Sequence, residues 1–121
     1  MAEKHVLVIE DNELNLKLMK AFLDIGKYRA LTATDAEIGI QLAREQRPDL
    51  IIMDIQLPGL DGLSATRIIK NDPDLQDLPV IGLSGFARNE DREQALDAGC
   101  SDYLTKPVEL HQFLDAIAKH F

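Results

Sequence analysis

The chain has 121 residues, of which 13 are basic and 21 acidic, so its formal net charge is −8. This length predicts one domain spanning residues 1–121, and the acidic balance argues against a surface that neutralises nucleic-acid phosphates or anionic lipids. The single Cys100 excludes an internal disulfide, and no Cys or His has the spacing of a zinc site. We therefore expect a cytoplasmic monomer without nucleic-acid or membrane partners.

Five short runs rich in Val, Ile and Leu alternate with amphipathic segments, which is the pattern of βα units that build a parallel sheet. The predicted strands are residues 5–9, 28–33, 49–53, 80–84 and 102–105. The first, third and fourth runs are the most apolar, which predicts central strands that are covered on both faces.

Helices are predicted between these runs. The first follows Asn12 and ends near Gly26. Its predicted core face consists of Leu14, Leu18, Met19, Phe22 and Leu23. The second helix follows Thr34, because the run from Thr34 to Glu37 has the pattern of a capping box.

Three more helices complete the pattern. They are predicted at residues 62–70, at 89–98 with Gly99 as the stop, and in the last segment of the chain. That last helix carries one apolar stripe of Leu110, Phe113, Leu114, Ile117, Ala118 and Phe121.

The order of these elements limits the fold class. Five βα units are too few for an eight-stranded barrel, and the chain has no G-x-G-x-x-G turn for a dinucleotide. We therefore predict an α/β fold of the flavodoxin-like (βα)5 type, a doubly wound parallel sheet of five strands in the order 2-1-3-4-5.

Three carboxylates stand where predicted strands end. Glu10 and Asp11 follow the first strand, and Asp54 follows the third. Because ligands of open α/β sheets bind outside the carboxyl ends of the strands, we expect these groups to converge on a site. Crowded carboxylates call for a cation, and this ligand type suits Mg²⁺, with Mn²⁺ as the alternative ion. Asp54 could then attack phosphorus and form an aspartyl phosphate.

Four motifs at the predicted strand ends give the chain a family resemblance. They are Glu10-Asp11-Asn12, Met53-Asp54-Ile55-Gln56-Leu57-Pro58, Leu83-Ser84-Gly85 and Tyr103-Leu104-Thr105-Lys106-Pro107. Together and in this order they resemble the receiver domain of two-component response regulators, the CheY-like superfamily, over essentially the full length. The runs at 10–15 and 53–58 are similar to those of single-domain regulators of the DivK type.

The resemblance implies a role for each acidic residue. Asp54 would be the phosphoacceptor. The metal ligands would be the carboxylates of Asp11 and Asp54, Glu10 mainly through a metal-bound water, and the backbone carbonyl of Gln56. Lys106, preceding a cis bond to Pro107, would pair with Asp54 before the reaction and with a phosphoryl oxygen afterwards.

The resemblance also implies a switch and two tuning positions. The Ser84 hydroxyl would bond the new phosphoryl oxygen, and Tyr103 would turn inward on activation. Gln56 and Phe86 would flank the phosphoryl group, and the apolar Phe86 favours a long-lived aspartyl phosphate because it cannot orient water. Gly85 stands where the family usually has Ala, which predicts a looser strand edge.

The functional prediction is a single-domain response regulator that accepts a phosphoryl group on Asp54 from a histidine kinase or a histidine phosphotransferase. A downstream protein would bind the face of the fourth helix, fifth strand and fifth helix, on or near which we expect Arg88, Glu93, Asp97 and Tyr103. The chain would be no enzyme beyond its own phosphorylation and dephosphorylation.

Two alternatives stay open. One is a receiver domain excised from a larger hybrid histidine kinase or response regulator. The other belongs to a different class, a small Mg²⁺-dependent phosphohydrolase of the haloacid dehalogenase type. That class places a general-acid Asp two residues after the nucleophile, where this chain has Gln56.

Overall fold

The computed structural model describes residues 3–85 and 88–121, and within them five strands alternate with five helices. The strands are β1 (His5–Ile9), β2 (Arg29–Ala33), β3 (Leu50–Asp54), β4 (Val80–Ser84) and β5 (Asp102–Thr105). The helices are α1 (Glu13–Ile25), α2 (Ala36–Gln46), α3 (Gly62–Asn71), α4 (Asn89–Ala98) and α5 (Leu110–Ala118). The strands pair in parallel in the order β2-β1-β3-β4-β5, so the predicted flavodoxin-like fold is confirmed.

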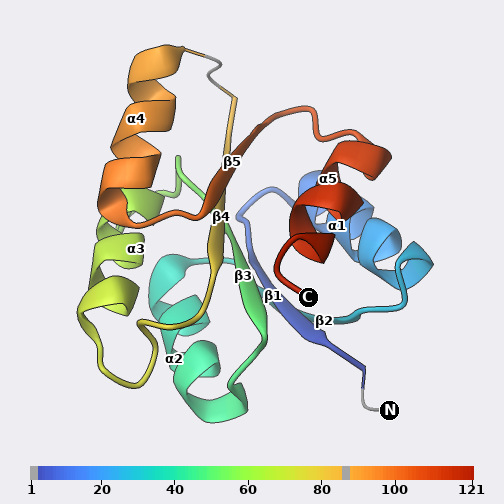
Figure 1. Ribbon diagram of the computed structural model, residues 1–121, viewed down its shortest axis with the longest axis horizontal. Coiled ribbons are helices and arrows are strands. Elements are labelled where there is room, and N and C mark those ends of the chain that lie inside the picture. Colours follow the sequence, from blue (N-terminus) through green and yellow to red (C-terminus); the bar gives the residue numbers. More distant parts are fainter. Residues whose placement is uncertain (1–2, 86–87) are drawn as a thin grey trace.

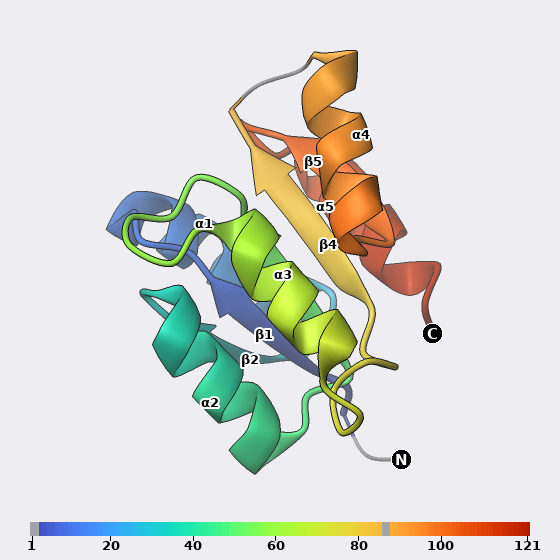
Figure 2. The ribbon, with the colours of Figure 1, turned by 90° about the vertical axis from the view of Figure 1, so that its left-hand side faces the viewer.

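Helices cover both faces of the sheet (Figure 1). On one face α1 and α5 bury Met19 and Phe113 against Val8 of β1. On the other face, turned toward the viewer in Figure 2, α2, α3 and α4 pack against a second apolar cluster that contains Leu7 of β1. Neighbouring β1 residues thus enter opposite cores, because successive side chains of a strand alternate between the two faces.

The strand prediction needs a correction of one residue at β2 and β3. β3 runs from Leu50 to Asp54 because its ladder with β4 continues to the pair Asp54 and Leu83. The next backbone N–H, that of Ile55, still donates to the Leu83 carbonyl at 2.8 Å. Asp54 is therefore the last residue of a buried central strand rather than a loop residue.

The predicted capping box at Thr34 is wrong. Asp35 is the N-cap of α2, and its Oδ1 accepts a hydrogen bond from the Ile38 N–H at 2.8 Å. Asp and Thr are both good N-caps, so the sequence pattern alone fits either start. The structure begins α2 one residue later than the predicted box requires.

The predicted core face of α1 is only partly correct. Met19 and Leu23 are buried, whereas Leu14 is 77% exposed and Leu18 is 42% exposed. Met19 and Leu23 belong to the apolar cluster that α1 shares with the sheet, whereas Leu14 and Leu18 are not part of it. α1 therefore presents apolar side chains to solvent.

The stripe of the last helix is also shorter than predicted. α5 buries Phe113 and Ile117, but it ends at Ala118, which is exposed. Phe121 lies beyond the helix and packs its ring on Tyr28, with 5.7 Å between the centroids. Within residues 3–85 and 88–121, no helix combines the length and the apolar character needed to cross a membrane.

Candidate functional site

The site lies at the carboxyl ends of β1 and β3, which are neighbours in the sheet. Ile9 pairs with Met53, so the residues that follow, Glu10 and Asp54, stand side by side. Glu10 is fully buried and Asp54 is 2% exposed. Two negative charges removed from water need compensation by a cation or by hydrogen bonds.

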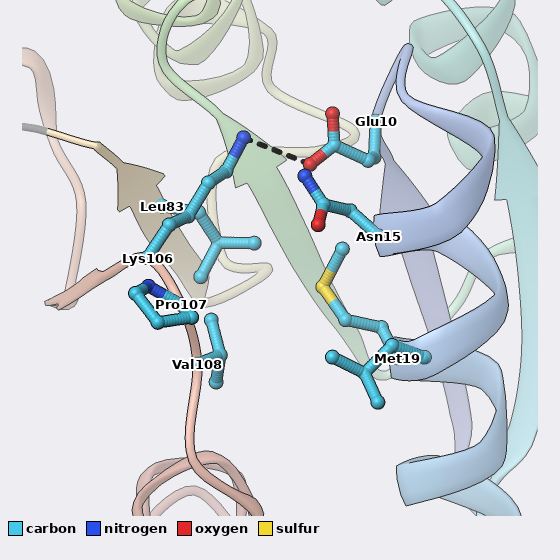
Figure 3. Close-up of a pocket in the computed structure, with 8 residues that line it drawn as sticks. Glu10, Asn15, Met19, Leu83, Lys106, Pro107 and Val108 are labelled. Carbon is cyan, nitrogen blue, oxygen red and sulfur yellow. Dashed lines mark ion pairs between the residues drawn. The ribbon is translucent and has the colours of Figure 1, made fainter.

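Lys106 supplies that compensation. Its Nζ lies 2.9 Å from Glu10 Oε1 and 3.0 Å from Asp54 Oδ2, and Figure 3 shows it reaching toward Glu10 from the segment after β5. Burial by itself would lower the pKa of Lys106, but hydrogen bonds and attraction from Glu10 and Asp54 outweigh it and raise that pKa above its usual value. Lys106 is therefore a fixed positive charge between the carboxylates at the ends of β1 and β3. The Lys106–Pro107 peptide bond is cis.

The third carboxylate, Asp11, completes an acidic cluster. One oxygen from each of Glu10, Asp11 and Asp54 can be chosen so that all three lie within 4.8 Å of one another. Asp11 is exposed, so the cluster opens to solvent on one side. Hard carboxylate oxygens at such separations are the donor set that Mg²⁺ takes with water completing its shell, so the residues fit the ion predicted from the sequence.

The end of β4 lies next to this cluster, because Leu83 of β4 pairs with Asp54 of β3 and Ser84 follows Leu83. Ser84 is buried, and its Oγ accepts a hydrogen bond of 2.6 Å from the Gln56 side-chain amide. Gln56 also donates its backbone N–H to Asp54 Oδ1 at 3.0 Å. The side-chain contact between Gln56 and Ser84 is not deducible from either motif alone. Phe86, the other expected tuning residue, lies outside the described residues.

The loop between β3 and α3 is held close to the strand end by Gly62. Its N–H donates to the Ile55 carbonyl at 3.1 Å, and a Cβ at this position would meet the Asp54 carbonyl oxygen at 2.1 Å. Only glycine allows this approach of α3 to the phosphoacceptor candidate. Asp61 fixes the same helix start, because its Oδ1 accepts from the Ser64 N–H at 2.8 Å.

A family model described as the response regulator receiver domain matches residues 6–118. The chain belongs to this family. The polar-differentiation response regulator DivK of Brucella anthropi is 39% identical over 117 residues, which are 97% of this chain and 95% of that protein. The receiver domain is thus DivK-like, as the sequence motifs indicated.

Two solved structures extend the comparison. The receiver domain of a sensor histidine kinase from Pseudomonas aeruginosa, with a magnesium ion coordinated in its active-site cleft, has a TM-score of 0.90 and 36% identity, covering 98% of this chain and 97% of that one. The co-crystal structure of the Saccharomyces cerevisiae histidine phosphotransfer protein Ypd1 and the receiver domain of Ssk1 contains a match with a TM-score of 0.88 and 30% identity, covering 97% and 88%. Receiver domains bind Mg²⁺ at an acidic pocket, and this chain has the acidic cluster for it.

Tyr103 of this receiver domain is buried in the cluster that also contains Ala95 of α4. Its side chain is therefore largely buried, and its inward turn on activation stays a prediction. Arg88, Glu93 and Asp97, the other residues expected on the partner face, are exposed. The exposed part of that face includes the charged α4 side chains Glu93 and Asp97 and also the apolar Leu96, which is 42% exposed.

Sequence reasoning missed a hollow beside the acidic cluster of the receiver domain. Figure 3 shows it between α1 and the segment after β5, and it is lined by Glu10, Asn15, Leu18, Met19, Leu83, Lys106, Pro107 and Val108. Its volume of about 30 Å³ accommodates a water molecule or a small side-chain group but no organic cofactor. The sequence signal that could have indicated this hollow is the apolar pair Leu18 and Met19 on α1, both of which line it.

Proposed function

We propose that this receiver domain accepts a phosphoryl group on Asp54 from a phosphohistidine protein, in a Mg²⁺-dependent reaction, and thereby changes its binding to a partner. The observation that carries the proposal is the pairing of the buried Asp54 carboxylate with the partly buried Lys106, beside two further carboxylates. The arrangement supplies a nucleophile, a fixed cation and an oxygen-rich cation site within one strand edge.

The chemistry follows from these groups. An Asp54 carboxylate oxygen attacks phosphorus, the bond between phosphorus and the donor imidazole nitrogen breaks, and that nitrogen keeps the electron pair and takes up a proton. Lys106 is 21% exposed and close enough to Asp54 to pair with an incoming phosphoryl oxygen. Glu10, Asp11, Asp54 and the Gln56 backbone carbonyl would hold Mg²⁺ or Mn²⁺, which neutralises phosphoryl charge when bound. The Ser84 hydroxyl would bond the bound phosphoryl group.

The chemical alternative is less well supported. A phosphohydrolase of the haloacid dehalogenase type uses an acid two residues after the nucleophile to protonate the leaving group, and Gln56 cannot donate a proton in that role. Its amide is instead engaged with Ser84. The DivK relative, of which this chain covers 95%, supports a stand-alone regulator, for which we propose a cytoplasmic location. The Pseudomonas structure supports the alternative of a receiver within a larger kinase.

The decisive experiment is phosphorylation of the parent and of Asp54→Asn with a small phosphodonor and Mg²⁺, read by intact mass. We expect one phosphoryl adduct on the parent, its loss with EDTA, and no adduct on the variant, because the amide is no nucleophile for phosphorus. Asp11→Asn serves as a matched control that keeps the nucleophile and weakens only the cation site. An equal adduct on Asp54→Asn would disprove the assignment of the phosphoacceptor.

The donor would approach over α1. Leu14 and Leu18 are exposed on this helix, and Leu18 also lines the hollow that ends at Lys106. An apolar helix face next to the acidic cluster suits a helical protein that carries the phosphohistidine, because docking there brings the donor nitrogen to Asp54. The downstream partner would use the separate face of α4, β5 and α5 with its acidic side chains Glu93 and Asp97.

The two faces can be tested against each other. Leu18→Asp should slow phosphoryl transfer from a phosphohistidine protein at least about tenfold, because it places a charge in an apolar contact, while phosphorylation by a small donor stays unchanged. The double variant Glu93→Lys and Asp97→Lys should leave transfer unchanged and weaken phosphorylation-dependent partner binding. Transfer is measured by a radiolabel chase, with Ile38→Asp on α2 as the exposed apolar control. Equal transfer to the Leu18 variant and the parent would rule out the α1 face.

A further inference from the structure

The Gln56 side chain joins the loop after β3 to the end of β4. Its Nε2 donates to Ser84 Oγ at 2.6 Å, and its Oε1 accepts from the Gly85 backbone N–H at 3.3 Å. The orientation of the amide is fixed by chemistry, since a backbone N–H can only donate and must meet the carbonyl oxygen of the side chain. The short contact to Ser84 is the stronger of the two, and the contact to Gly85 is near the limit of a hydrogen bond.

We infer that the Gln56 side chain is a latch, a positioning residue that holds Ser84 and Gly85 in the resting arrangement and that an incoming phosphoryl group must displace. The inference rests on the proposed function, because it concerns the phosphoryl group on Asp54. Both partners of Gln56 belong to β4 and the residue after it, the strand edge that pairs with Asp54. The latch lies only two residues after the phosphoacceptor, at the end of β3, and its backbone N–H donates to Asp54 Oδ1.

The competition is between a neutral amide and an anion. A backbone N–H carries one hydrogen, so Gly85 can serve either Gln56 Oε1 or a phosphoryl oxygen at full strength. Hydrogen bonds to an ionised acceptor are about twice as strong as those between neutral groups. The phosphoryl oxygen therefore displaces Gln56 Oε1 from the Gly85 N–H. The phosphorylated arrangement forms less favourably than it would without the latch, because Gln56 loses its contacts to Ser84 and Gly85. The latch sets how readily Ser84 is recruited.

The opposite role is also chemically conceivable, and it predicts the opposite result. If the Gln56 amide turned to donate to the phosphoryl group, its removal would weaken phosphoryl binding. If it is a latch, its removal strengthens phosphoryl binding. The side chain can be changed without touching the backbone groups of Gln56, because its contacts to Ser84 and Gly85 are separate from its N–H bond to Asp54.

The test uses Gln56→Met, which keeps the length of the side chain and removes its donor and acceptor. Beryllofluoride with Mg²⁺ serves as the phosphoryl mimic, and its affinity is measured by calorimetry. We expect about fivefold tighter binding, the change that corresponds to one neutral hydrogen bond. Gln41→Met on α2, whose amide pairs with Glu45 at 3.0 Å, is the matched control and should bind like the parent.

Two further readouts separate a latch from a general structural effect. In the resting protein without beryllofluoride, the Gly85 amide should exchange with solvent about fivefold faster in Gln56→Met than in the parent. In a Ser84→Ala background, the gain in beryllofluoride affinity from Gln56→Met should shrink below twofold, because the main partner of the latch is gone.

Each outcome decides the proposal. Weaker beryllofluoride binding by Gln56→Met, or unchanged binding together with unchanged Gly85 exchange, overturns the latch while leaving the phosphoacceptor role of Asp54 intact. Failure of the parent itself to bind beryllofluoride overturns the proposed function, and the latch with it, because nothing would then compete for Gly85. Tighter binding, faster exchange and a reduced effect in the Ser84→Ala background support it.

Discussion

Replacing Lys106 by methionine will lower the free energy of unfolding by about 3 kcal/mol, because it leaves the buried Glu10 and Asp54 without their shared cation. Breaking a fully buried ion pair by removing one partner costs about 3–5 kcal/mol, and the partial exposure of Lys106 places the expectation at the lower end. For a domain of this size that corresponds to a fall in Tm of about 10 °C. Thermal and urea unfolding at neutral pH without Mg²⁺ measure it.

The control for this variant is Lys119→Met. Lys119 pairs with Asp102 at 3.5 Å, but its side chain is 69% exposed, so its loss should change stability by less than about 0.5 kcal/mol. Mg²⁺ should restore stability to Lys106→Met more than it stabilises the parent, because it replaces the missing positive charge. Equal stability of the Lys106 and Lys119 variants would show that the buried carboxylates do not depend on this cation.

The sign of the pH dependence follows from the raised pKa of Lys106. The stabilisation by the charged ammonium is fully present below the ordinary lysine pKa, about 10.4, and is lost as the pH rises through the higher folded pKa. The stability difference between the parent and Lys106→Met should therefore be constant between neutral pH and about pH 10, and should narrow at higher pH. Urea unfolding of the parent and of Lys106→Met across this pH range measures how much the ion pairs of Lys106 with Glu10 and Asp54 contribute to stability.

Much of the site was predictable because topology and residue type act together. A short apolar run between amphipathic segments is typical of a central strand, and the carboxyl end of such a strand lies at the ligand edge of a parallel sheet. Acidic groups at 10, 11 and 54 therefore had to meet once the strands were assigned. The family motif predicted the position of Lys106, but its nearly equal distances to Glu10 and Asp54, 2.9 and 3.0 Å, depend on the side-chain packing around it.

The errors arose where two local solutions have similar free energies. Thr34 and Asp35 are both adequate caps, and the loop after β2 decides between them. Helical periodicity places Leu14 and Leu18 on the apolar face of α1, but it does not show which part of that face the rest of the protein covers. The hydrogen bond between Gln56 and Ser84 joins residues 28 positions apart, so only the three-dimensional structure could reveal it.

The second large effect is expected at Gly62, where alanine should destabilise the protein by about 3 kcal/mol. An alanine Cβ there would lie 2.1 Å from the Asp54 carbonyl oxygen and 2.7 Å from Ile55 Cα, and both are backbone atoms that cannot turn aside. Overpacking of this kind typically costs about 1–3 kcal/mol or more. At an ordinary helix position the same change would stabilise by about 1 kcal/mol, so the sign itself is diagnostic.

Gly85→Ala is the matched control for this steric effect. Among the described residues other than its chain neighbours, no atom lies within 4 Å of a Cβ placed at Gly85, so we expect a change within about 0.5 kcal/mol. Urea unfolding gives both values, and a Mg²⁺ titration should show weaker binding only in Gly62→Ala, because the added Cβ would displace the end of β3 at Asp54 and the loop that carries Gln56. If Gly62→Ala were as stable as the parent and bound Mg²⁺ equally well, α3 would be free to shift without moving the acidic cluster. The position of Asp54 would then have to be fixed by its ion pair with Lys106 and its place in the β3–β4 ladder alone.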